Sequence, residues 1–263
     1  MKKIVALLLA AMMLFALAGC AKTEKTDWAY IEDKGELIVG ITLFAPMNYH
    51  DENGELTGFE TEFAKALGEK LGVDVKFQEI TWSAKETELN SKNIDCIWNG
   101  MTITPERLET MDISVPYMEN KQVLVVKAEN VDAMADLAGK SIVAEKESAG
   151  ETVAQNEAAF AEASYTPVDS QAKALMEVAS GTADGAVIDY VMSIGSIGEG
   201  TDYADLVVVE GAAFSPEQYG IAFRKDSPET LQKVNDAIAA LAADGTLNDI
   251  AAKYKLADLL LVK

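Results

Sequence analysis

The chain has 263 residues, of which 49% are hydrophobic and 25% charged, with only 6 prolines and 18 glycines. That composition excludes a disordered chain and a collagen-like chain, and two cysteines are too few for a disulfide scaffold. Asp and Glu outnumber Lys and Arg by 43 to 22, which gives a formal net charge of −21. A surface this acidic argues against nucleic acid as a partner, because phosphate binding needs clustered Lys and Arg.

The residues that usually carry metal or nucleophilic chemistry are scarce. The single histidine, His50, lies in a polar turn beside Asp51 and Asn53, so we expect it to be solvated. Cys96 lies in an apolar segment without cationic neighbours, which favours a buried structural thiol. The sequence contains no His-x-x-x-His pair, no Cys-x-x-Cys and no P-loop, so we expect no metal, nucleotide or other cofactor.

The first residues are typical of a secretory signal. A basic start, Met1-Lys2-Lys3, is followed by an apolar run over 4–18 that is short for a spanning helix. The run ends in Leu17-Ala18-Gly19-Cys20, which resembles a bacterial lipobox, in which the cysteine becomes the lipidated first residue. We therefore predict a signal peptide over 1–19, lipidation at Cys20 and a tether over 20–27; the alternative is an ordinary signal peptide with an incidental cysteine. The body is then anchored outside the cytoplasmic membrane, at the cell surface or in the periplasm.

The remaining chain alternates short apolar strands with amphipathic helices, which predicts an α/β architecture. In chain order, the patterns predict strands over 37–41, 73–77, 124–126, 141–144 and 183–188, and helices over 58–71, 150–161 and 170–180. A last helix is expected to start at Pro228 with Ser227 as its cap, and Gly245 is placed to stop it. Length and composition alone leave open one large domain or two lobes.

Six segments resemble, in order, the polar amino-acid-binding proteins that serve ABC importers. They are Gly58-Phe59-Glu60-Thr61-Glu62-Phe63 and its continuation to 71, Met101-Thr102-Ile103-Thr104-Pro105-Glu106-Arg107, 112–117, 181–189, 219–225 and 244–246. The resemblance implies two α/β lobes, joined by two strands, that close over a ligand like a hinge. It places lobe 1 at 28–118 and 218–263, lobe 2 at 122–213, and the hinge near Gln122 and Glu217.

The resemblance also assigns partners to the two charged groups of a free amino acid, both of which are costly to desolvate. Arg107 takes the carboxylate with its planar fork, helped by Thr102, while the Gly100 carbonyl and the Asp189 carboxylate take the ammonium. Without the resemblance, Arg107 is a solvated residue at a helix start. Asp189, likewise, is then an acid that caps the helix starting at Tyr190.

The walls of the expected site come from aromatic rings and one helix start. Phe44 and Trp82 match rings that pack on the ligand side chain, with core packing as the alternative for both. Ser148 and Ala149 match a helix start whose backbone N–H groups face the carboxylate, although relatives more often have glycine where this chain has Glu147. The side-chain preference stays open among cystine, arginine, glutamine and others.

The predicted function is therefore capture of a free amino acid and its delivery to a membrane permease by a monomeric, non-enzymatic protein. The alternative is a dehydratase of the cyclohexadienyl type on the same scaffold, which needs a positioned general acid. Glu86, Glu145 and Glu147 are candidates for that acid, and Glu86 is equally a candidate partner for a basic ligand or a solvated residue. A sensing ectodomain is a third interpretation, but no membrane span follows the body in this sequence.

Overall fold

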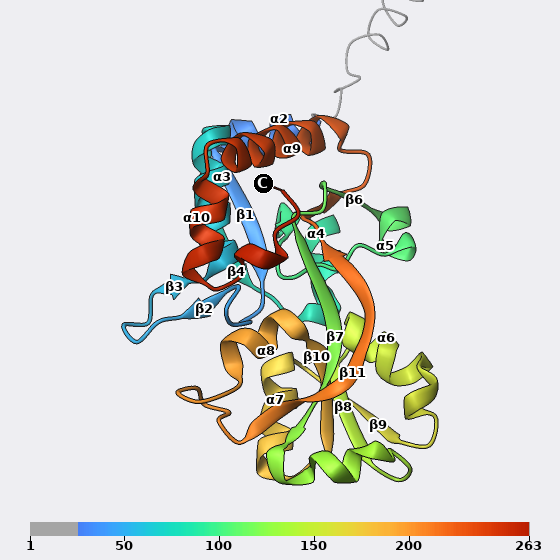
Figure 1. Cartoon of the computed structure of the whole chain (residues 1–263). Coiled ribbons are helices and arrows are strands. Elements are labelled where there is room, and N and C mark those ends of the chain that lie inside the picture. The colour runs from blue at the N-terminus through green and yellow to red at the C-terminus, as the bar shows by residue number, and fades with distance from the viewer. Residues whose placement is uncertain (1–25, 263) are drawn as a thin grey trace, which may run out of the picture.

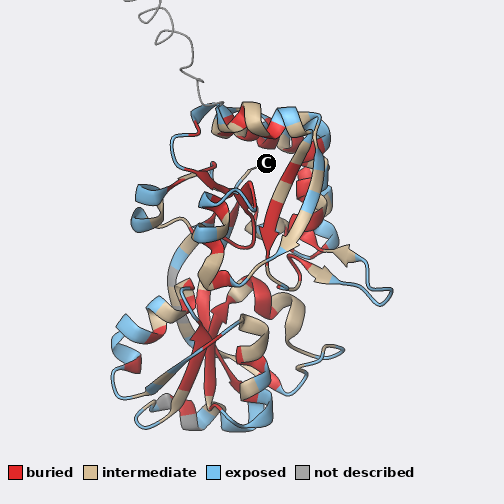
Figure 2. Ribbon diagram, turned by 180° about the vertical axis from the view of Figure 1, so that it is seen from behind, coloured by how far each residue is buried: buried red, intermediate tan, exposed pale blue. Residues whose placement is uncertain are grey.

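The computed structural model describes residues 26–262 and has two α/β lobes, one above the other in Figure 1. Each lobe is built on its own five-stranded sheet. Figure 2 shows buried strands at the centre of each lobe and exposed residues along the outer faces of the helices. The two-lobed α/β fold expected from the sequence is confirmed. The predicted signal peptide, Cys20 and most of the predicted tether lie outside the described residues.

The sheet of the first lobe combines strands from both ends of the chain. In spatial order its strands are β4 (Asp74–Glu79), β1 (Glu36–Ile41), β5 (Cys96–Ile97), β12 (Ala222–Arg224) and β6 (Met111–Ile113). β1 pairs in parallel with β4 and β5, whereas β12 runs antiparallel to β5 and β6. A hairpin of β2 (Tyr49–His50) and β3 (Leu56–Thr57) extends from this lobe. Cys96 is fully buried, and His50 is exposed, as the sequence predicts.

Helices cover this first sheet. They are α2 (Asp27–Lys34), α3 (Phe59–Leu71), α4 (Lys85–Asn90) after the 3₁₀ turn η1 (Trp82–Ala84), α5 (Pro105–Thr110), α9 (Pro228–Ala243), α10 (Thr246–Lys253) and the turn η4 (Ala257–Leu259). The predicted stripe of α3 is buried at Phe59, Phe63 and Leu67. Ser227 stands at the start of α9 as predicted, but its side chain makes no capping bond; its N–H instead donates to Asp112. No helix within residues 26–262 is long and apolar enough to cross a bilayer.

The second sheet has the order β11 (Leu206–Tyr219), β7 (Met118–Lys127), β10 (Gly185–Asp189), β8 (Ser141–Glu145) and β9 (Ser164–Val168). β10, β8 and β9 are parallel to one another, so their carboxyl ends lie at one edge of the sheet. In parallel α/β sheets this edge is where ligands collect.

Helices α6 (Ala149–Asn156), α7 (Gln171–Ser180) and α8 (Tyr190–Ser196) and the turns η2 (Ala128–Ala135) and η3 (Ala158–Phe160) complete the second lobe. The predicted helix over 150–161 is too long, because α6 ends at Asn156 and the backbone of Glu157 is extended. The chain turns there so that the buried ring of Phe160 packs on Phe214, with ring centroids 5.4 Å apart.

Two long paired strands connect the lobes. β7 and β11 run side by side from one lobe to the other in Figure 1, and they pair antiparallel over most of their length. Asn120 faces Glu217 in this register, and Gln122 lies two residues further along β7. The connection therefore places polar side chains at the level between the two sheets, where the candidate site lies.

Candidate ligand-binding site between the lobes

A small cavity of about 10 Å³ lies where the two lobes meet. Its lining is Trp82, Asn99, Gly100, Thr102 and Arg107 from the first lobe and Glu145, Ser148, Ala149, Gln171 and Asp189 from the second. All the site residues expected from the sequence are in this lining except Phe44. A larger pocket of about 650 Å³ shares Thr102, Arg107, Ser148 and Ala149 with the cavity, and its lining also includes Glu86.

Gly100 has a backbone position that excludes any side chain. Its φ is +57°, in the left-handed region, and a Cβ there would lie 2.7 Å from the ring of Phe44. Phe44 thus packs behind Gly100, buried in the core, and does not line the cavity. The Gly100 N–H donates to Oε1 of Glu60 at 2.9 Å. Burial raises the pKa of Glu60 to about 7, although this bond and one from Tyr117 oppose the rise.

Arg107 is held at the start of a short helix rather than free in solvent. Thr104 caps α5 by accepting from the Arg107 N–H, and Pro105 occupies the first position of the helix. One guanidinium nitrogen, Nη1, donates to the Thr102 carbonyl at 2.7 Å, and the guanidinium carbon lies 5.9 Å from the centre of the Trp82 ring. Burial lowers the pKa of Arg107, while Glu217 and Asp189 raise it; arginine stays charged in proteins.

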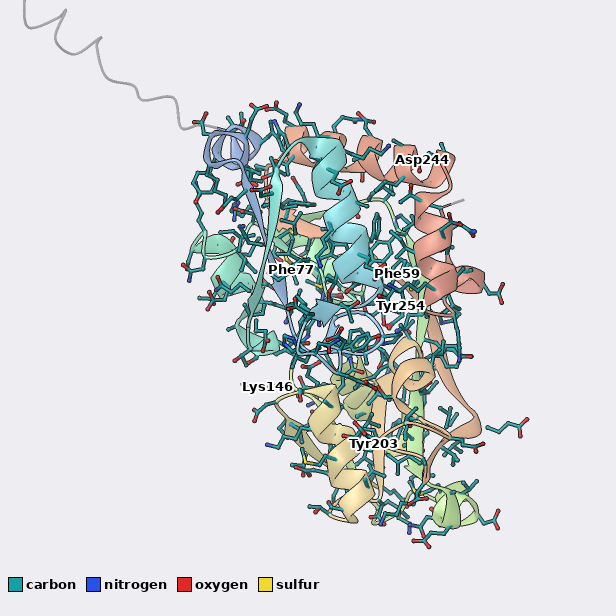
Figure 3. All side chains as sticks on the ribbon, turned by 90° about the vertical axis from the view of Figure 1, so that its left-hand side faces the viewer. Phe59, Phe77, Lys146, Tyr203, Asp244 and Tyr254 are labelled. Carbon is teal, nitrogen blue, oxygen red and sulfur yellow. The ribbon has the colours of Figure 1, made fainter. Side chains whose placement is uncertain are left out.

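The carbonyl of Glu147 joins the first lobe to the second. It accepts from Trp82 Nε1 at 3.2 Å, from Lys85 Nζ at 3.4 Å and from Arg107 Nη2 at 3.4 Å. Figure 3 shows the adjacent Lys146 at the level where the lobes meet. Glu147 has a φ of +59°, in a backbone region that favours glycine. This explains why relatives more often have glycine at the position where this chain has Glu147.

Ser148 caps helix α6, so that the helix start faces the cavity. Its Oγ accepts from the Glu151 N–H at 3.1 Å, and its own N–H donates to the Glu145 carbonyl at 3.2 Å. The first helical N–H, that of Ala149, has no partner one turn earlier within the helix. Of the two N–H groups expected to face a ligand, the one of Ala149 is therefore the better placed to donate.

Asp189 ends strand β10 and is 5% exposed. It stands just before helix α8, but its side chain makes no capping bond, so the capping interpretation does not describe it. Its carboxylate instead accepts from three side-chain amides: Gln122 at 2.8 Å, and Asn120 and Gln171 through shorter contacts. These three neutral donors fix the orientation of the carboxylate.

Two further acids lie close to Asp189. Glu217 accepts from Gln122 at 2.7 Å and from Asn120, and Glu145 ends strand β8 beside β10. Burial, and then the charge of Asp189, raise the pKa of each of these two glutamates to about 8. Within residues 26–262, no group of three or more His, Cys, Asp or Glu side chains is arranged to hold a metal ion.

Several lining residues were absent from the sequence prediction. Gln171 and Asn99 line the cavity, and Asn120 orients Asp189 from outside the lining. The sequence offers Glu145 only as a candidate general acid. The sequence could have placed Glu145 in the site, because Glu145 ends an apolar strand as Asp189 does. The carboxyl ends of parallel strands lie together at one edge of the sheet. The three amides carried no such signal.

Two α/β lobes, connected by paired strands and sharing a polar cavity, define a two-lobed binding protein. A family model, that of the bacterial extracellular solute-binding proteins, family 3, matches residues 37–257. The chain belongs to this family.

Three relatives illustrate the match. The L-cystine-binding protein TcyJ of Escherichia coli (strain K12) is 32% identical over 87% of this chain and 85% of its own length. The arginine-binding extracellular protein ArtP of Bacillus subtilis is 30% identical over 97% of this chain and 98% of its own length. The chain also resembles the crystal structure of the ancestral amino acid-binding protein AncCDT-1, a precursor of cyclohexadienyl dehydratase. The match covers 86% of this chain and 98% of the AncCDT-1 chain, at 33% identity and a TM-score of 0.77.

Proposed function

We propose that this chain is the extracytoplasmic amino-acid-binding component of an ABC importer, which captures a free amino acid and delivers it to a membrane permease. One observation carries the proposal. A guanidinium, that of Arg107, and a buried carboxylate, that of Asp189, line the same cavity from different lobes. The names of the curated relatives, which include binding proteins for cystine and arginine, support it.

The chemistry of a free amino acid fits this pair. Its carboxylate and ammonium stand on one carbon, and burying either without a partner costs several kcal/mol. Arg107, with the Ala149 N–H and the Thr102 hydroxyl, is assigned to the carboxylate. Asp189 and the Gly100 carbonyl are assigned to the ammonium. Trp82 supplies a ring wall for the ligand side chain, and Phe44 packs behind Gly100.

Ligand entry requires the lobes to separate. A cavity of about 10 Å³ holds about one water molecule, far less than an amino acid. We assign lobe 1 to 28–118 and 218–263 and lobe 2 to 122–213, with a hinge in β7 and β11 near Gln122 and Glu217. The contacts of Trp82, Lys85 and Arg107 with the Glu147 carbonyl join the two lobes and break when the lobes open.

The cellular context follows from the start of the sequence. A signal peptide over 1–19 directs export, and a lipid on Cys20 holds the monomeric body at the membrane beside its permease. A Cys20→Ala variant should then be released into the soluble extracellular or periplasmic fraction. The wild-type protein should partition into detergent and incorporate radiolabelled fatty acid.

Binding without turnover is the proposed activity. The curated relatives are named as binding proteins, and the dehydratase precursor is itself named as amino acid-binding. Incubation of the purified protein with prephenate or arogenate should therefore leave both compounds unchanged. Measurable turnover of either would favour the dehydratase alternative.

A melting-temperature screen against all common amino acids and cystine tests the function directly. A ligand at a hundred times its dissociation constant adds about 2.7 kcal/mol to the free energy of unfolding. For a protein of this size, that gain corresponds to a rise in Tm of roughly 5–11 °C. A protein that melts at the same temperature with every α-amino acid would refute the proposal.

A further inference from the structure

Glu145 lies in the cavity, but the charged head of an amino acid does not need it. Glu145 and Asp189 end neighbouring parallel strands, so both carboxyl groups stand at one sheet edge and line the same cavity. Glu145 is 4% exposed, and its Oε1 is buried without a hydrogen-bond partner. Because an unsatisfied buried oxygen is costly, such an atom aimed at a ligand cavity calls for a donor from the ligand.

The cavity holds one more acid than a simple zwitterion uses. The lining contains one cation, Arg107, and two acids, Glu145 and Asp189. A zwitterion that occupies Arg107 and Asp189 leaves Oε1 of Glu145 without a hydrogen-bond donor. The charge of Lys85 lowers the pKa of Glu145, but its Nζ donates to the carbonyls of Trp82 at 3.3 Å and Glu147 at 3.4 Å and not to Glu145.

Resting on the proposed function, we infer that Glu145 selects amino acids with a positively charged side chain, and that its free Oε1 receives that charge. The adjacent wall is the Trp82 ring, which lines the same cavity. Lys85 Nζ at 4.9 Å and the Arg107 guanidinium carbon at 5.9 Å already lie near the centre of that ring, so the Glu145 carboxylate has to offset their repulsion of a third cation. An aromatic face beside a carboxylate is a favourable environment for an organic cation.

Glu145 also gives the binding event a proton signature. The charged groups near it are Asp189 on β10, Lys85 on α4 and Arg107 on α5. Burial and the Asp189 charge raise the pKa of Glu145 to about 8, so this carboxyl is mainly protonated at pH 7. A ligand cation at Oε1 favours the ionised carboxylate, so binding should release that proton to the buffer.

The test uses matched ligand pairs and two acid variants. Arginine is compared with citrulline, and lysine with norleucine, by isothermal titration calorimetry at pH 7 in buffers of different ionisation enthalpy. We expect the wild type to bind the charged member of each pair about tenfold to a hundredfold more tightly, the range for a hydrogen bond to a charged group. Glu145→Gln, which keeps the shape of the side chain, should bring that ratio close to one and abolish the proton release.

Glu86→Gln is the matched control, because Glu86 is an acid of the outer pocket that is absent from the cavity lining. It should keep the wild-type preference and the proton release. A Glu145→Leu variant, with its fold checked by circular dichroism, provides a second readout and should bind citrulline no more weakly than the wild type does.

The inference and the proposed function fail in different ways. A wild type that binds no amino acid refutes the function. A wild type that binds neutral amino acids or cystine as tightly as arginine and lysine refutes only the inference. So does a Glu145→Gln variant that keeps the preference, or one that loses all amino acids alike, because the latter result would assign Glu145 to the amino-acid head. A preference erased by Glu86→Gln assigns the selection to Glu86 instead.

Discussion

Arg107 offers the sharpest test of the site, because its charge and its fork geometry can be removed separately. Arg107→Lys keeps a positive charge but loses the planar pair of donors, and Arg107→Met removes both while keeping much of the apolar stem. In the structure the guanidinium makes a hydrogen bond of 2.7 Å with the Thr102 carbonyl and a longer one with the Glu147 carbonyl. Loss of the shorter bond should cost about 1 kcal/mol of folding stability.

The expected effect on binding is larger than the effect on folding. Each charge-assisted hydrogen bond to the ligand carboxylate is worth about 1.5–3 kcal/mol, so loss of one bond in Arg107→Lys should weaken binding about tenfold to a hundredfold. In Arg107→Met the ligand carboxylate is buried without a counterion, at a cost of about 3–5 kcal/mol. The dissociation constant should then rise more than a hundredfold, and the order of affinity should be wild type, Lys, Met.

Calorimetric titration with the amino acid found in the melting screen measures both losses, and the melting temperature without ligand measures the structural cost. Glu109→Gln, an exposed change on the same short helix, is the matched control and should leave binding unchanged. A Met variant with wild-type affinity would refute the assignment of Arg107 to the carboxylate. So would a Lys variant that binds no better than the Met variant while both fold normally, because the retained charge would then have no effect.

Three further predictions concern stability. Gly100→Ala should destabilise the protein by about 1–3 kcal/mol in urea unfolding, because of its φ of +57° and the Phe44 ring 2.7 Å from the new Cβ; an unchanged midpoint would contradict this packing. The raised pKa of Glu145, about 8 against an ordinary 4.5, means that the folded state holds the proton more tightly, so the free energy of unfolding should fall by about 1.4 kcal/mol per pH unit between these values. Glu145→Gln removes this contribution and should be most stabilising near pH 8–9 and neutral below pH 4.5; parallel pH profiles for variant and wild type would count against it. Arg224→Met should cost about 3–5 kcal/mol, because the buried Asp27 carboxylate loses its guanidinium partner at 2.5 Å, while Asp95 loses the same guanidinium at 3.0 Å but keeps its ion pair with Lys34; thermal unfolding within 1 °C of wild type would rule this out.

The sequence predicts the elements that have strong local patterns. Helix α3 follows its stripe of Phe59, Phe63 and Leu67, and strand β1 follows its apolar run, because period and burial agree there. The end of α6 is missed because it depends on the contact of Phe160 with Phe214, fifty-four residues away in the chain. Helix α2 is missed because its single buried turn, with Trp28 and Ile31, is too short to show a period.

The site residues also divide into those that local sequence predicts and those that it misses. Thr102 and Arg107 fall in one short segment that resembles a known family, and Gly100 directly precedes it, so sequence alone brings the three together. Asn120 and Gln122 on β7 and Gln171 at the start of α7 orient Asp189, and such amides carry no distinctive sequence pattern. The role of the two β7 amides depends on the register of β7 with β10, in which Gln122 lies directly opposite Asp189. Only pairing over long sequence separations creates that contact.

The neutral partners of the two charges explain why the site suits a zwitterion. Asp189 is held by amides and Arg107 by carbonyls, and among residues 26–262 no ion pair joins either of them to an opposite charge. Had the two paired with each other, a ligand would first have to break a buried ion pair. Because their partners are neutral and they belong to different lobes, the uncompensated charges gain full Coulomb energy only when a ligand with both signs lies between them. Closure of the lobes is then coupled to the chemistry of the ligand, and a ligand with only one of the two charges should leave the lobes apart.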